Sequence, residues 1–203
     1  MLRVILVLAV LLGVQCAGPV GAAEPGCERV ASWVAMMKAR SQAQLDAARA
    51  TALFSYEGSV IYAVRRFEMS RSNAARAKAL LDVMPSTEEE DRQIGSLGDS
   101  SQCNSETVAE MFLLGKMSDL LAKRLAEAVL HDTTTLPRYF EYVRRISQTP
   151  HGAGAVEMRH VCRSNHAAFV SAVRGLDADS REWFVSHIMK PDNCKVLALP
   201  EAE

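Results

Sequence analysis

Apolar residues recur at spacings of three and four along most of this chain. Such spacing places side chains on one face of a helix and predicts amphipathic α-helices. No stretch alternates apolar and polar residues for long, so the chain is expected to be all-α. The longest stripe comprises Val108, Met111, Phe112, Leu114, Met117, Leu121, Leu125 and Val129.

The pattern predicts an irregular bundle of six or seven helices. Polar or glycine- and proline-containing connectors separate the apolar stripes, and these connectors set the expected boundaries. The helical stretches fall at about 27–40, 41–67 (which could continue the first), 73–84, 87–94, 105–130, 135–147, 155–174 and 177–190.

Capping signals mark several of these boundaries. Asn73 precedes one helical stretch, and Thr87 stands three residues before Glu90 in a capping-box pattern. Gly175 and Pro191 stand where two later stretches should end. The acidic run 88–91 is then explained by the positive end of a helix dipole.

The first 23 residues have the layout of a cleavable secretory signal. Arg3 precedes an apolar run over 4–14, and small residues fill 18–23. Cleavage is expected after Ala23, which places the mature protein in the periplasm or outside the cell. Lipidation of Cys16 is the alternative, but it is disfavoured because Gln15 is not small.

The remaining residues, 24–203, are expected to form one helical domain, and the loop 95–104 is the candidate for a subdomain boundary. The whole chain carries 23 Lys and Arg against 24 Asp and Glu, and loss of Arg3 lowers the basic count by one. Near-balanced charge argues against nucleic-acid binding. No transmembrane segment is expected after signal cleavage, and the partner is an unidentified protein or small molecule.

Four cysteines lie beyond the signal: Cys27, Cys103, Cys162 and Cys194. An even number in an exported chain favours two disulfides, although three pairings are open in principle. Cys162 and Cys194 lie at similar distances from an expected turn at 176–177, so an antiparallel hairpin would bring them together. This predicts a Cys162–Cys194 disulfide and leaves Cys27 to pair with Cys103.

The same hairpin offers a metal site as an alternative. Cys162 and His166 are four residues apart on one helix face, while His187 and Cys194 belong to the facing arm. Two thiolates and two imidazoles would suit tetrahedral zinc. The export signal and the even cysteine count favour the disulfide, and no cofactor is expected.

No motif in the chain specifies an enzymatic reaction. The sequence has neither the CxxCH haem attachment motif nor the HExxH motif of metalloproteases, and no nucleophile elbow. Arg138, Arg144 and Arg145 could bind an acidic partner or form a solvated face. The expected function is a non-enzymatic interaction or binding module of the cell envelope; the alternative is a metal-binding protein or enzyme that uses the Cys/His cluster.

Overall fold

A computed structural model describes residues 25–49, 55–99, 108–147, 153–189 and 194. Within these ranges the chain is helical and contains no β-strand, which confirms the all-α fold class. The predicted signal over 1–23, Cys16, Cys103 and Pro191 lie outside the described residues.

The described helices are shorter and more numerous than predicted. Their bounds are α2 Pro25–Lys38, α3 Gln42–Ala48, α4 Tyr56–Glu68, α5 Ala74–Asp82, α6 Glu88–Gly95, α7 Val108–Gly115, α8 Met117–Ala128, α9 Leu136–Ile146, α10 Ala153–Ser164, α11 His166–Arg174 and α12 Ala178–Phe184. Two 3₁₀ turns, η2 Ser96–Asp99 and η3 Thr133–Thr135, and a π-helical turn, η4 Val185–Met189, complete the order.

The prediction of six or seven helices is wrong because polar caps divide long apolar stripes. Ser55 caps α4 by accepting a hydrogen bond from the Gly58 amide at 3.1 Å, so 41–67 is not one helix. Asn165 caps α11 in the same way, accepting from the Ala168 amide at 3.3 Å, and divides 155–174. Each cap satisfies an amide that has no partner inside its own helix.

The predicted helix over 105–130 is also divided, at Gly115 and Lys116. At this break two backbones approach closely, because η2 packs against α7 at Gly98. A Cβ on Gly98 would lie 2.8 Å from the Cα of Gly115, so only glycine fits at position 98 without a shift. Met117, expected in the core, is fully buried.

Two predicted helix starts are confirmed by their caps. The Asn73 side chain accepts from the Arg76 amide at 3.1 Å at the start of α5. Thr87 and Glu90 form the predicted capping box at the start of α6. Burial by itself would raise the pKa of Glu90, but hydrogen bonds from Ser86 and Thr87 outweigh that effect and lower the pKa.

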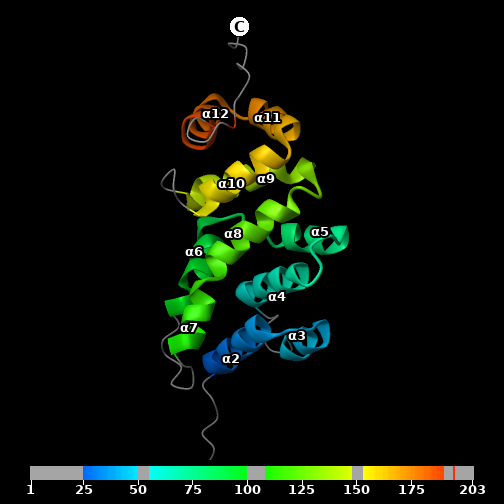
Figure 1. Ribbon diagram of the computed structural model, residues 1–203. Coiled ribbons are helices and arrows are strands. Elements are labelled where there is room, and N and C mark those ends of the chain that lie inside the picture. The colour runs from blue at the N-terminus through cyan, green and yellow to red at the C-terminus, as the bar shows by residue number, and fades with distance from the viewer. Residues whose placement is uncertain (1–24, 50–54, 100–107, 148–152, 190–193, 195–203) are drawn as a thin grey trace, which may run out of the picture.

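The helices stack along one long axis, from α2 and α3 at one end to α11 and α12 at the other (Figure 1). Helix α8 lies in the middle and contacts α4, α5, α6 and α10. Its residues Leu121 and Leu125 are fully buried and belong to a continuous apolar core with Phe67 and Tyr139. Helix α10 therefore connects the central helices to the α11–α12 end.

The three arginines of α9 hold neighbouring elements together. Arg138 donates to two carbonyl oxygens near the end of α5, at 3.2 and 2.6 Å, and Arg144 donates to the Ser180 hydroxyl. Arg145 bonds to Asp91 at 2.7 Å. Burial raises the pKa of Asp91, and the Arg145 guanidinium opposes that rise. These arginines therefore contact the protein itself. Arg138 and Arg144 are also exposed, as the predicted solvated face requires, and Arg145 is half-buried.

In the part of the chain that the structure describes, no helix combines the length and the hydrophobicity that crossing a bilayer would require.

Candidate functional sites: a sulfur–histidine cluster and an apolar groove

The predicted Cys162–Cys194 disulfide is present at the α11–α12 end of the molecule. Cys162 lies in the last turn of α10, and Cys194 follows η4, which packs back against α10. Their Cα atoms are 6.3 Å apart, within the range of ordinary disulfides. Both side chains are almost completely buried.

The second predicted disulfide is only partly within the described residues. Cys27, near the start of α2, is disulfide-bonded. Its predicted partner Cys103 lies outside the described residues, so the pairing Cys27–Cys103 stays a prediction.

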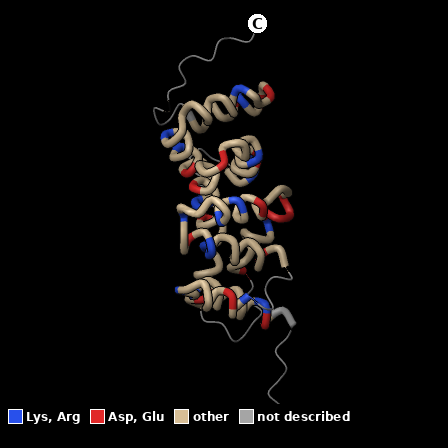
Figure 2. Tube along the Cα trace, turned by 90° about the vertical axis from the view of Figure 1, so that its right-hand side faces the viewer, with Lys and Arg blue, Asp and Glu red and all other residues tan. Residues whose placement is uncertain are grey.

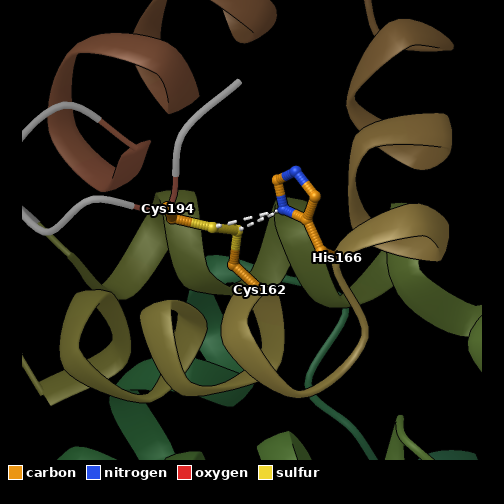
Figure 3. A group of neighbouring side chains, drawn as sticks. All are labelled: Cys162, His166 and Cys194. Carbon is orange, nitrogen blue, oxygen red and sulfur yellow. Dashed lines mark hydrogen bonds between the residues drawn. A yellow bond between two sulfur atoms is a disulfide. The ribbon is translucent and has the colours of Figure 1, made fainter. Parts of the chain in front are cut away.

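His166 lies directly beside the Cys162–Cys194 disulfide (Figure 3). Its Nδ1 atom is 3.8 Å from the Cys162 sulfur and 3.8 Å from the Cys194 sulfur. His166 is the first residue of α11, directly after the cap Asn165, so the break between α10 and α11 fixes its position. We call Cys162, His166 and Cys194 the sulfur–histidine cluster.

His187 does not join this cluster, which corrects the predicted four-ligand set. The three possible ligand atoms that lie within 4.8 Å of one another belong to Cys162, His166 and Cys194. The His187 ring instead stacks on Trp183, with centroids 5.0 Å apart. Its Nδ1 is 2.7 Å from the Ser186 hydroxyl and 3.0 Å from the Trp183 carbonyl oxygen.

Aromatic side chains hold the elements around the cluster. The Phe140 ring of α9 contacts Phe169 of α11 at 5.0 Å and Phe184 of α12 at 4.6 Å between centroids. Trp183 packs edge-on against Phe184 at 4.9 Å. These ring contacts bind α11 and α12 to α9 and leave the cluster at a rigid, largely apolar end of the bundle.

A second candidate site is an open groove of about 570 Å³, which shares only helix α10 with the cluster. We call it the α7–α8 groove, although α2, α4 and α10 also contribute to it. Its apolar residues are Met37, Leu113, Leu120 and Val156, and its charged residues are Arg65, Glu68, Lys116, Asp119, Lys123 and Glu157.

Buried ion pairs fix one side of the groove. Arg124 of α8 donates to Glu68 from Nε at 3.1 Å and from Nη2 at 2.8 Å, and to Glu127 at 2.6 Å. Arg65 pairs with the same Glu68 and donates to the Ala39 carbonyl at 2.7 Å. The charged side chains at this side are therefore held in place before any ligand arrives.

Large apolar side chains are exposed next to the groove. Val156, which lines it, is 45 % exposed, and Phe112 and Val108 on α7 are 65 % and 88 % exposed. The Lys116 ammonium of the groove lies 4.3 Å from the Phe112 ring centre. Phe112 and Val108 were expected inside the core stripe of a single long helix. In the structure their side of α7 faces solvent instead.

No family model matches this sequence, and no curated protein or solved structure is significantly similar to it.

Proposed function

We propose that this protein is an exported, non-enzymatic binding module of the cell envelope, and that its α7–α8 groove holds an amphipathic polypeptide segment of a partner protein. The exposed apolar side chains beside a preformed groove carry this proposal. Three large apolar side chains are strongly exposed among the described residues, and they belong to α7 and to the wall of the groove. Val108 and Phe112 are four residues apart on one face of α7, and exposed apolar surface of this kind marks interaction sites.

The charges around the groove favour a polypeptide over a polyanion. Three cations and three anions line it: Arg65, Lys116, Lys123, Glu68, Asp119 and Glu157. Figure 2 shows the same interspersion of Lys and Arg with Asp and Glu along the trace. A nucleic acid or an anionic lipid surface would call for an excess of cations. An amphipathic helix with an apolar stripe and mixed flanking charges matches this groove.

Export is supported by the predicted signal over 1–23 and by the Cys162–Cys194 disulfide, which is compatible with an oxidising compartment. Cell fractionation with intact-mass measurement tests this part. The expected product is found outside the cytoplasm and begins at Glu24. A cytoplasmic product that retains residues 1–23, or a lipid adduct on Cys16, would refute it.

Site-specific photo-crosslinking in the native host tests the groove. A photoreactive phenylalanine at Phe112 or Val156 should capture one protein, whereas the same group at the exposed Ala178 of α12 should not. Mass spectrometry then identifies the linked segment, and a synthetic peptide of that segment should bind the purified protein. Leu120→Lys puts a charge into the groove. It should lower the affinity for that peptide by at least about tenfold, because a buried apolar contact is replaced by an unpaired charge.

Three outcomes would refute the groove proposal. They are an adduct of twice the chain's mass, which indicates a second copy, a small-molecule adduct, and equal capture from position 178.

A further inference from the structure

In the sulfur–histidine cluster, the distances from the histidine nitrogen to the two sulfurs are close to those between ligands of one metal ion, although the two sulfurs are joined in a disulfide. In tetrahedral zinc, Zn–S distances of about 2.3 Å and Zn–N distances of about 2.0 Å place a sulfur and a nitrogen ligand about 3.6 Å apart. The His166 Nδ1 atom lies 3.8 Å from each of the two sulfurs. The nitrogen therefore already occupies the position of a third ligand with respect to both cysteines.

We propose that reduction of the Cys162–Cys194 disulfide converts this cluster into a Cys2His zinc site. A dithiol supplies two electrons and two protons; its own sulfurs form a disulfide while Cys162 and Cys194 become thiols. Binding of Zn²⁺ then releases those two protons to solvent and forms two Zn–S bonds and one bond to His166 Nδ1. Water fills the fourth position, because His187 is stacked on Trp183 and held by hydrogen bonds.

Small side-chain movements are enough for this conversion. The two sulfurs must separate from bonded contact to about 3.8 Å, the spacing of two thiolates on tetrahedral zinc. The ends of α10 and α11 keep Cys162 and His166 in place, and the return of η4 onto α10 keeps Cys194 nearby.

Burial and ligand type favour zinc in the reduced state. Cys162 and Cys194 are almost fully enclosed, whereas the half-buried His166 leaves a route from solvent for the ion and its water ligand. Two thiolates and an imidazole form a donor set that zinc prefers over magnesium or calcium. A newly made chain carries these thiols before oxidation, so the site exists at least in that state.

Metal titration of the full-length protein tests the proposal. Reduced, metal-free protein under anaerobic conditions should bind Co²⁺ with thiolate-to-metal charge-transfer absorption, and Zn²⁺ should displace the cobalt. The oxidised protein should show neither response. Reduction also frees the other cysteines, so the signal must be assigned to residues by variants.

The variants separate this site from other thiols. Cys162→Ser and Cys194→Ser should abolish the charge-transfer band. His166→Ala should lower zinc affinity by more than about 100-fold, because loss of a metal ligand costs more affinity than loss of a residue that only hydrogen-bonds to a ligand. His187→Ala and Cys27→Ser should keep full affinity. Equal affinity in His166→Ala and the parent protein, or loss of binding in Cys27→Ser, would overturn the proposal.

A folding readout covers the case in which the reduced protein is unstable. If reduction lowers the melting temperature, zinc should raise it again in the parent protein and in His187→Ala, but not in His166→Ala. A reduced protein that zinc neither binds nor stabilises would overturn the proposal. None of these measurements depends on the α7–α8 groove.

Discussion

Tyr139 is a single residue whose chemistry conflicts with its surroundings. Its side chain is fully buried in α9, and among the described residues its hydroxyl has no hydrogen-bond partner. Burial raises the pKa of this phenol far above its usual range. Tyr56 makes an instructive contrast, because its hydroxyl donates to the Val83 carbonyl at 3.0 Å.

Removing the two hydroxyls should therefore have opposite effects. Tyr139→Phe is expected to leave the free energy of unfolding unchanged or to raise it by up to about 1 kcal/mol, because an unpaired buried polar group is removed. Tyr56→Phe should lower it by about 1 kcal/mol, because a hydrogen bond is lost. Urea denaturation of both variants measures the difference. A larger loss in Tyr139→Phe than in Tyr56→Phe would show that the Tyr139 hydroxyl has a partner.

At the scale of single elements, the breaks between helices determine the sites. The exposed Phe112 and Val108 lie on α7, which ends at the Gly98–Gly115 contact, and His166 lies beside the two sulfurs directly after the Asn165 cap.

The two glycines of the η2–α7 contact should respond differently to the same substitution. Gly98→Ala should cost about 1–3 kcal/mol of stability, because its Cβ would lie 2.8 Å from backbone. In Gly115→Ala the nearest atom to the new Cβ is at 3.7 Å, an ordinary contact, so this variant should be nearly neutral. Thermal unfolding compares them, and equal losses would mean that the close contact does not require glycine at position 98.

The cap of α12 should make part of the stability dependent on pH. Asp177 accepts from the Ser180 amide at 2.9 Å, and hydrogen bonds from the Ser180 hydroxyl and backbone lower the pKa of Asp177. The pKa of Asp177 in the folded state lies below the ordinary value of 3.8. The stability that the charged cap contributes is therefore complete at pH values above 3.8, and it is lost as the pH falls through the lowered pKa.

Asp177→Asn provides the matched comparison, since Asn caps a helix without titrating. The melting temperature of the parent protein relative to Asp177→Asn should be highest near neutral pH and should fall upon acidification to about pH 2. A difference that does not change with pH would show that the Asp177 charge does not contribute to the cap.

The fold class and the local helix caps could be predicted from sequence because their causes lie within a few residues. The Thr87–Glu90 capping box and the Asn73 cap are examples. The Cys162–Cys194 pairing was predicted from a hairpin of two helices, and it holds although Asn165 interrupts the first arm. The α7–α8 groove could not be predicted, because five helices far apart in sequence supply its walls. The exclusion of His187 from the cluster depends on its stacking with Trp183, which spacing alone does not show.

At the scale of the whole molecule, the Cys162–Cys194 disulfide closes one end of an elongated stack of helices (Figure 1). Under oxidising conditions, Cys162→Ser or Cys194→Ser should lower the free energy of unfolding by about 3–4 kcal/mol, since the bridge spans 32 residues. For a chain of this size that corresponds to a fall of roughly 10 °C in melting temperature. Calorimetry with and without a reductant measures the effect.

Under metal-free reducing conditions the parent and both variants should unfold at similar temperatures. A serine variant as stable as the oxidised parent would show that packing alone holds this end of the molecule.

The position of the bridge also sets an order of events during synthesis. Cys162 leaves the ribosome before α11, α12 and η4, and it must wait for all three before Cys194 arrives. Throughout that interval its thiol is available to other thiols and disulfides that it meets. A thiol-trapping pulse during synthesis should therefore label Cys162 in incomplete chains. The Cys162–Cys194 bond, which joins the α10 and η4 ends of the stack, should be the last disulfide to form.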